Sequence, residues 1–256
     1  MSRFENSRVL ITGASKGLGK SLAFAFKREG AKLALVARSG NKLEEIEKLF
    51  NINCKQTHLF LELDLLLPEN VRKLTDKIAN VWSGIDIIVH CIGGSFGINS
   101  TLVDWKNFSK SLEGNLGIAM QINNNLVPIM VEQGYGNIVH VGSIVSSEAK
   151  ASVPYNTSKA ALSGYVRSLG NKLIDQGIVI TGILPGAFYG DDNAMSRYEF
   201  YKPEEYKEFV KKLPQQRMPQ VEEYVPMIFL LSAKDSKIMA GSLVTMDGGQ
   251  GISYYN

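Results

Sequence analysis

The chain has 256 residues, of which 45% are hydrophobic and 21% are charged, a composition that is typical of a globular protein with a buried core and excludes a disordered chain. The formal net charge of +3 arises from 28 basic and 25 acidic residues that are interspersed along the sequence, so no basic face for nucleic acid is expected. No apolar run reaches the roughly 18 residues needed to cross a bilayer, which excludes a transmembrane protein.

The N-terminus and the cysteine content both indicate a cytoplasmic protein. The chain passes from Met1 to Asn6 directly into an apolar segment and shows no signal-peptide pattern. Its two cysteines, Cys54 and Cys91, are too few for a disulfide framework, and both stand in apolar surroundings where a free thiol packs as a small hydrophobic group. We therefore expect a reducing compartment.

Short apolar runs alternate along the chain with longer segments of helical length. The runs predicted as strands are residues 9–12, 32–37, 59–63, 85–91, 138–141, 179–184 and 243–246. Strands that are apolar on both faces and separated by helices are typical of a parallel sheet covered on both sides. The sequence thus predicts a doubly wound α/β fold of Rossmann type, with a mostly parallel seven-stranded sheet flanked by helices. No linker or repeat divides the chain, so residues 1–256 are expected to form a single domain.

A glycine-rich turn follows the first predicted strand and precedes a helical segment. Its sequence from residue 12 to residue 19 is Thr-Gly-Ala-Ser-Lys-Gly-Leu-Gly. Glycines allow a tight turn and a close approach of the backbone to a pyrophosphate, and the helix N-terminus offers unpaired N–H groups to an anion. The residues expected to bind a dinucleotide here are Gly13, Ser15, Lys16, Gly17, Leu18 and Gly19. A plain strand-to-helix turn is the alternative interpretation.

The end of the second predicted strand indicates which dinucleotide binds. NAD-specific folds carry an acidic residue there that binds the ribose 2′-hydroxyl, whereas this chain has Arg38 and Ser39. The Arg38 guanidinium can pair with a 2′-phosphate, and Lys16 can add a second positive charge. We therefore expect the cofactor to be NADP(H). The alternative is that Arg38 is a solvated residue at a strand end.

Tyr155 and Lys159 open a strongly helical segment and stand four residues apart. At this spacing they share one helix face, so the ammonium can lie near the phenol oxygen. A free phenol has a pKa of about 10, and a neighbouring cation is expected to lower it. Tyr155 is therefore the candidate acid/base group and Lys159 its activator. An amphipathic surface helix is the alternative, because such pairs also occur by chance.

Together with Ser143, which follows the fifth predicted strand, this pair resembles the active site of the short-chain dehydrogenase/reductase family. The loop spacing Gly-x-x-x-Gly-x-Gly resembles the same family. The resemblance implies that Ser143 donates a hydrogen bond to the substrate oxygen. It also implies that Asn115, within Glu-Gly-Asn-Leu-Gly, is the fourth active-site residue and holds a water that relays protons to Lys159.

The resemblance extends over nearly the whole chain and implies further cofactor contacts. The matching positions are Asp64, Leu65, Gly93, Pro185 and Gly186, in addition to Tyr155 and Lys159. Asp64 matches the group that binds the adenine amine, and Pro185 and Gly186 match the turn that faces the nicotinamide. Taken singly, Asp64 could instead be a helix cap and Pro185-Gly186 an ordinary turn.

The sequence departs from the family pattern at two places. After the fourth predicted strand the family has Asn-Asn-Ala-Gly, whereas residues 90–93 are His-Cys-Ile-Gly. The structural hydrogen bonds of the first Asn must therefore be supplied by His90 or be lost. Beyond Pro185-Gly186, the threonine with which the family touches its cofactor is absent from residues 187–190.

The histidines are not arranged as metal ligands. His58, His90 and His140 fall in or near apolar strands and have neither a partner four residues away nor a carboxylate cluster beside them. A core or strand-end role is favoured over metal ligation, and we expect no metal.

Residues 188–218 form a long insertion beyond the sixth predicted strand, at the edge where open α/β sheets bind ligands. The insertion is rich in aromatic residues, and residues 204–213 have the spacing of a short amphipathic helix. We expect a mobile substrate lid. The alternative, favoured for Phe209 and Leu213, is that these side chains pack the helix onto the body. Aromatic groups here suit an apolar substrate or the face of a sugar ring.

The expected function is that of an NADP(H)-dependent oxidoreductase acting on CH–OH groups, which transfers a hydride between the nicotinamide and a carbonyl or alcohol substrate. Keto reduction is the favoured direction, and the substrate of the reversible reaction is expected to be a small ketone, a polyol or a sugar-type compound. A 3-oxoacyl-(acyl-carrier-protein) reductase is an alternative, weakened because residues 132–134 and 175–177 are neutral or acidic where such a reductase carries basic residues. A non-catalytic NADP(H)-binding sensor or scaffold is a second alternative, and the glycine spacing disfavours a sugar-nucleotide epimerase.

The resemblance to the family implies a homodimer or homotetramer formed through the helices that carry Asn115 and Tyr155. Core packing explains the apolar residues of these helices equally well.

Overall fold

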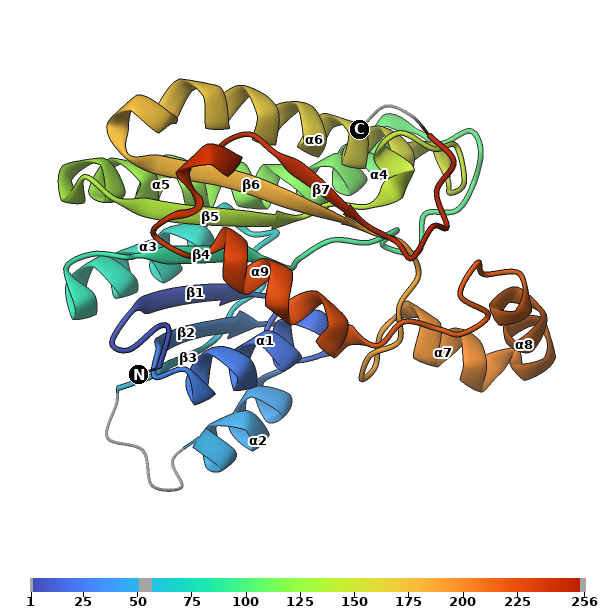
Figure 1. The fold of residues 1–256 in the computed structure, drawn as a ribbon, viewed down its shortest axis with the longest axis horizontal. Coiled ribbons are helices and arrows are strands. Elements are labelled where there is room, and N and C mark those ends of the chain that lie inside the picture. Colours follow the sequence, from blue (N-terminus) through green and yellow to red (C-terminus); the bar gives the residue numbers. More distant parts are fainter. Residues whose placement is uncertain (1, 51–56, 254–256) are drawn as a thin grey trace.

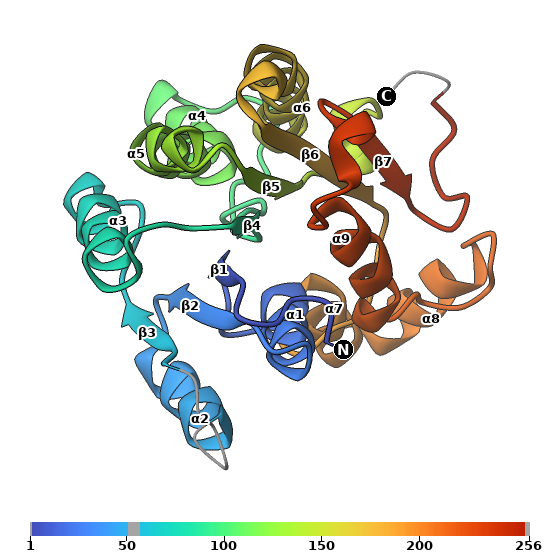
Figure 2. The same cartoon turned by 60° about the vertical axis from the view of Figure 1, so that its left-hand side comes forward.

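A computed structural model describes residues 2–50 and 57–253 of the chain. Helices cover both faces of one central sheet (Figures 1 and 2). Cys54 lies outside the described residues, and Cys91 is a half-buried free thiol. Within the described part of the chain, no helix combines the length and the apolar character required to cross a membrane.

The sheet confirms the predicted fold. Its strands are β1 Arg8–Thr12, β2 Lys32–Ala37, β3 Leu59–Glu62, β4 Ile87–His90, β5 Gly136–Val141, β6 Ile178–Pro185 and β7 Leu243–Met246. All neighbouring pairs are parallel, in the order β3-β2-β1-β4-β5-β6-β7. The order reverses between β1 and β4, so the loops after these two strands run to opposite sides and leave a crevice at the carboxyl edge of the sheet.

The fourth strand is shorter than residues 85–91, the span expected from its apolar run. It ends at His90 because the backbone N–H of Cys91 leaves the ladder and donates to the hydroxyl of Thr12 (3.1 Å). The N–H of Ile92 also points to this hydroxyl (3.4 Å). Thr12 therefore ties the loop after β4 to the end of β1, across the crevice.

Side chains on alternate strand positions face two different helical layers, which is why the strands are apolar throughout. The helices flanking the sheet are α1 Gly17–Arg28, α2 Gly40–Phe50, α3 Pro68–Trp82, α4 Trp105–Leu112, α5 Ile118–Gln133, α6 Val153–Leu173 and α9 Val225–Leu231. Val9 and Ile11 of β1 join the core formed with α1, α2 and α9, whereas Leu10 joins the core formed with α3, α5 and α6.

The segment after β6 contains two short helices, α7 (Ala194–Tyr201) and α8 (Pro203–Lys211), which extend from one end of the molecule beside the ends of β6 and β7 (Figure 1). Helix α8 confirms the helix expected over residues 204–213. A small separate core of Tyr206, Leu213 and Met218, with Phe209 packed against it, holds the segment together. These apolar side chains therefore pack largely within the segment itself.

Candidate active site

The glycine-rich turn connects β1 to α1 and depends on the absence of side chains. The backbone φ angles of Gly13 and Gly17 are +67° and +51°, in a region that residues with side chains avoid. A Cβ at Gly19 would stand 2.3 Å from the carbonyl oxygen of Gly13. No side chain caps α1, and the amides of Leu18 and Gly19 have no hydrogen-bond partner among the described residues. The turn can therefore accept an anion at these amides.

Arg38 and Lys16, the candidate ligands of a 2′-phosphate, differ in their surroundings. Arg38 directly follows β2, is exposed, and has no ion-pair partner within the described part of the chain. Ser39 follows it and precedes α2. Lys16 lies beside Asp192, with Nζ 3.6 Å from Oδ2. A free guanidinium at the end of β2 is therefore available to an anionic ligand.

Asp64 shapes the turn between β3 and α3. Its Oδ1 accepts a hydrogen bond from the N–H of Leu66 (3.1 Å), and its carbonyl accepts one from the side chain of Asn70 (3.0 Å). The residue that caps α3 is Leu67 and no side chain caps this helix, so the alternative role of Asp64 as a helix cap is wrong. The second carboxylate oxygen of Asp64 has no partner among the described residues. The side chain of Leu65 is 2% exposed, so this residue can meet a cofactor mainly through its backbone.

Ser143, Tyr155 and Lys159 lie together at the carboxyl end of β5. Ser143 caps a short 3₁₀ turn, where its Oγ accepts a hydrogen bond from the N–H of Val145 (3.3 Å). Tyr155 and Lys159 stand one turn apart near the start of α6, and the Ser143 side chain hydrogen-bonds Tyr155. The Nζ of Lys159 lies 5.9 Å from the centroid of the Tyr155 ring. The structure thus brings these three predicted residues together.

The pKa of Tyr155 differs from the expectation. Burial raises it, and the hydrogen bond with Ser143 partly opposes this effect, so the predicted lowering by Lys159 is wrong for this structure. The ammonium of Lys159 instead donates to the carbonyl oxygen of Val141 (2.8 Å). Burial lowers the pKa of Lys159 to about 8. The cation is therefore held by the backbone of β5, beside the phenol and not directly on its oxygen.

Asn115 connects the loop after β4 to this group. It lies in a single π-helical turn, Glu113–Gly117, between α4 and α5. Its side chain pairs with both backbone groups of Gly94 (3.0 Å each) and donates to the carbonyl of Ser111 (2.9 Å). A Cβ on Gly93 would stand 2.9 Å from Asn115 Oδ1 and 3.0 Å from Lys159 Nζ. Asn115 and Lys159 therefore approach the same bare glycine.

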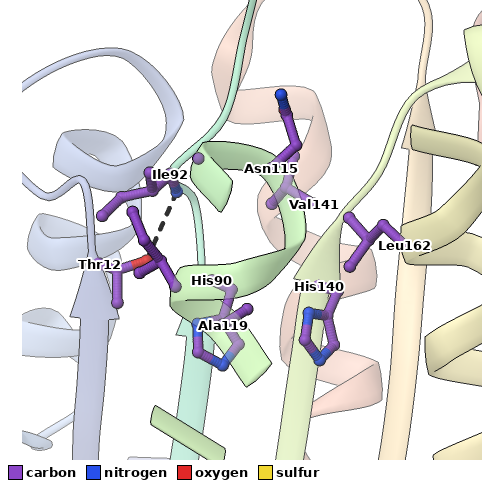
Figure 3. A pocket seen from close by; sticks show the side chains of 10 residues that line it. Thr12, His90, Ile92, Asn115, Ala119, His140, Val141 and Leu162 are labelled. Atoms are coloured by element: carbon purple, nitrogen blue, oxygen red, sulfur yellow. Dashed lines mark hydrogen bonds between the residues drawn. The ribbon is translucent and has the colours of Figure 1, made fainter. Parts of the chain in front are cut away.

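His90, which replaces the first Asn of the family pattern, lines a small cavity together with Asn115 and His140 (Figure 3). Its Nε2 hydrogen-bonds Asn123 on α5 (2.9 Å), and its ring stacks on that of His140 from β5. The hydrogen bonds expected to neighbouring strands are thus replaced by one to a helix. Both rings are almost completely buried, and three of their four ring nitrogens have no hydrogen-bond partner among residues 2–50 and 57–253. The cavity of about 10 Å³ has the size of one water molecule.

The turn at Pro185 and Gly186 is held by the C-terminal strand region. The N–H of Gly186 donates to Met246 (3.3 Å), and the N–H of Ala187 donates to the side chain of Gln250 (2.7 Å). Gln250 was not predicted, since a lone glutamine past the last strand carries no sequence signal. It fixes the backbone where the threonine of the family pattern is missing.

Comparison with known proteins identifies the family. The family model for short chain dehydrogenases matches residues 7–200. The 3-oxoacyl-(acyl-carrier-protein) reductase of Aquifex aeolicus is 26% identical over 245 residues, which cover 94% of this chain and 95% of that protein. The glucose 1-dehydrogenase of Gluconobacter oxydans is 28% identical over 254 residues, which cover 96% of this chain and 92% of that protein.

The solved structures that are similar to this chain have the same fold. L-Sorbose reductase from Gluconobacter frateurii, in complex with NADPH and L-sorbose, has a TM-score of 0.89 at 25% identity, with 99% of this chain and 100% of that one covered. The resemblance inferred from the glycine turn and from Ser143, Tyr155 and Lys159 is thereby confirmed. The protein is an oxidoreductase with a Rossmann-type sheet, and it belongs to the short-chain dehydrogenase/reductase family.

Proposed function

We propose that this oxidoreductase uses NADP(H) to reduce a small ketone of the sugar or polyol type, in the cytoplasm. The observation that carries the proposal is the convergence of Ser143, Tyr155, Lys159 and Asn115 at the carboxyl edge of the sheet, on the same edge as the glycine turn. Two of the similar proteins are named for sugars, and one was solved with NADPH and L-sorbose.

The residues at the glycine turn fit a dinucleotide. Gly13 and Gly19 leave space that a Cβ would fill, and the amides of Leu18 and Gly19 lack partners in the described chain. The free guanidinium of Arg38 matches the charge and the planar geometry of a 2′-phosphate contact. NADPH bound there supplies the hydride. These observations favour NADP(H) over NAD(H), whose adenosine ribose has no anion for Arg38 to bind.

Tyr155 donates its proton to the carbonyl oxygen of the substrate while the carbonyl carbon accepts the hydride. Ser143 donates a hydrogen bond to the same oxygen and polarises the carbonyl. Lys159, fixed by Val141, stabilises the tyrosinate that Tyr155 leaves. Asn115 holds the backbone at Gly94 and thereby positions the preceding residue, Gly93, which lies next to Lys159.

The proposal is tested by following NADPH absorbance with a panel of ketoses, simple ketones and diketones, and by repeating each assay with NADH. We expect turnover with at least one small keto compound and a higher kcat/KM with NADPH than with NADH. Binding of NADPH with no turnover across the panel would support instead a sensor or scaffold, which has no need for Ser143, Tyr155 and Lys159 to lie together.

A 3-oxoacyl-(acyl-carrier-protein) reductase is the second candidate, favoured by the similarity to the Aquifex aeolicus protein. A 3-oxoacyl thioester is therefore included in the panel, both on coenzyme A and on the carrier protein. A kcat/KM for the carrier-bound thioester that exceeds that for every ketose would select this activity.

We also propose that the protein forms a homodimer or a homotetramer through the helices that carry Asn115 and Tyr155. Light scattering tests this proposal.

A further inference from the structure

The carboxylate of Asp192 gathers three cations from three separate parts of the chain. Its oxygens lie 2.6 Å from Lys42 Nζ, 3.6 Å from Lys16 Nζ and 3.0 Å from Arg197 Nη1. Lys16 belongs to the glycine turn, Lys42 to the first turn of α2, and Arg197 to α7. These cations hold the pKa of Asp192 at about 2, so it is an anion throughout the neutral range.

The backbone presents this carboxylate in an unfavourable conformation. Asp192 has a φ of +49°, in the left-handed region that costs energy for a residue with a side chain. The following residue, Asn193, caps α7 by accepting hydrogen bonds from the N–H groups of Met195 (2.9 Å) and Ser196 (3.0 Å). The ion pairs of Asp192 and this cap together hold the strained turn in place.

The neighbouring residues of the same loop lie directly on the start of α1. The N–H of Gly17 donates to the carbonyl of Asp191 (2.8 Å), and the carboxylate of Asp191 pairs with Lys20 (2.5 Å). A Cβ at Gly190 would stand 3.4 Å from the Cα of Gly17. The loop therefore occupies one of the amides at the helix N-terminus where a phosphate anion would make its contacts.

Two of the cations held by Asp192 come from the segments that carry the proposed ligands of the 2′-phosphate. Lys16 is one candidate ligand of that phosphate, and Lys42 stands three residues after Ser39, whose carbonyl accepts the N–H of Leu43 in the same helical turn. Arg38, immediately before Ser39, is left without an ion-pair partner in the described chain. A carboxylate and a phosphate that are paired with the same lysine side chains carry like charges at close range and would repel each other.

We propose that Asp192 is an internal competitor of the cofactor's 2′-phosphate and thereby determines how the free enzyme discriminates between cofactors. NADP(H) takes Lys16 and Lys42 from Asp192, which leaves its carboxylate paired with Arg197 alone. NAD(H) carries no group that can replace the carboxylate, so it must bind without releasing Asp192. The inference rests on the proposed use of NADP(H).

The test is the affinity of the purified enzyme for NADPH and for NADH, measured by the fluorescence of the reduced nicotinamide in the absence of substrate. Asp192→Asn removes the competing charge and is expected to tighten NADPH binding about tenfold while changing NADH binding less than about twofold. Asp192→Glu keeps an anion in the loop and is expected to restore an affinity close to that of the wild type. Thermal unfolding without cofactor shows that each variant is folded.

Asp191→Asn is the matched control, because it removes the same charge from the same loop but its partner is Lys20 on α1. It is expected to alter NADPH and NADH affinity by the same factor. Unchanged or weaker NADPH binding by Asp192→Asn would overturn the inference, as would an equal NADPH-specific gain in Asp191→Asn. Tighter binding of NADH than of NADPH by the wild type would instead reject the proposed cofactor, independently of both variants.

Discussion

The rings of His90 and His140 stack with their centroids 4.7 Å apart, because the two residues are register partners on the adjacent strands β4 and β5. Burial lowers the pKa of His90 to about 4 and that of His140 well below its ordinary value. A charge on the His140 ring would lie next to the His90 ring and near the ammonium of Lys159. The pair is therefore neutral at pH 7 and resists protonation in the folded state.

Acid should destabilise the protein through this pair. An unfolded histidine has a pKa of about 6.5, so between that pH and about 4 the unfolded state binds more protons than the folded one, and the free energy of unfolding falls as the pH falls. For His90 the loss from pH 7 to pH 5 is about 2 kcal/mol. Urea unfolding at the two pH values measures it, and His90→Asn should show a smaller difference. An equal pH dependence in both proteins would contradict the assignment.

Tyr155→Phe tests the proton donor. The variant keeps the ring but loses the hydroxyl, so we expect kcat to fall by about 10²- to 10⁴-fold while NADPH affinity changes little. Tyr165→Phe is the control, since Tyr165 lies on the same helix and its hydroxyl accepts a hydrogen bond from Asn123. It should keep activity within a few-fold of the wild type. Normal turnover by Tyr155→Phe would end the proposed mechanism.

The buried Lys159 should limit activity at high pH. Its pKa is lowered to about 8, so the ammonium is present below that pH and is lost as the pH rises through it. Ketone reduction should therefore decline above about pH 8, when the tyrosinate loses its stabilising charge. The measurement is kcat from pH 6 to pH 10 at saturating NADPH and ketone, with Lys159→Met as the variant that lacks the cation throughout. A flat wild-type profile would refute this role.

Arg38→Asp should reverse or abolish the preference for NADP(H). The change replaces a cation that can pair with the 2′-phosphate by a carboxylate that repels it, and the ratio of kcat/KM for NADPH to that for NADH should fall at least about tenfold. Arg72→Asp, an equal change at an exposed position of α3, is the control. If both variants shift the ratio equally, the effect belongs to net charge and Arg38 has no specific role.

Gly19→Ala should disrupt the glycine turn. Its Cβ would stand 2.3 Å from the Gly13 oxygen, so the backbone of the turn must move and NADPH affinity should fall at least about tenfold. Gly164→Ala in α6 meets nothing within 4 Å and should instead raise the free energy of unfolding by about 0.5 to 1 kcal/mol. Calorimetry of NADPH binding and urea unfolding compare the two variants, and unaltered NADPH binding by Gly19→Ala would argue against a phosphate contact.

The strands and the placement of Tyr155 and Lys159 on one helix face follow from local sequence, whereas the role of Ser143 was inferred from the resemblance to the family. Apolar runs of strand length predict a parallel sheet, and the i,i+4 spacing in a helix places Tyr155 and Lys159 together whatever the rest of the chain does. Helix α7 was not predicted, because it buries none of its residues and therefore has no apolar periodicity. Its start depends on Asn193, whose capping role needs the turn at Asp192.

The contacts that depend on strand register could not be predicted. The stacking of His90 on His140 requires β4 and β5 to pair at those two residues, and nothing in either strand alone fixes that pairing. The position of the Lys159 ammonium could not be predicted either, because it depends on how α6 packs on β5, where the ammonium donates to the carbonyl of Val141. The expected lowering of the Tyr155 pKa was inferred from helical spacing alone. It therefore left out the Val141 carbonyl that binds the ammonium and the effect of burial on the phenol.

In the loop after β4, Gly93 has no space for a side chain, whereas the three residues before it carry side chains of ordinary size. Before the glycine, Cys91 and Ile92 pack into the two helical layers and His90 lines the water-sized cavity, so these three side chains lie away from the reacting groups. At Gly93 a single methyl group would touch both an amide oxygen and an ammonium. The short separation between Asn115 and Lys159 across the loop therefore depends on the absence of a side chain at residue 93.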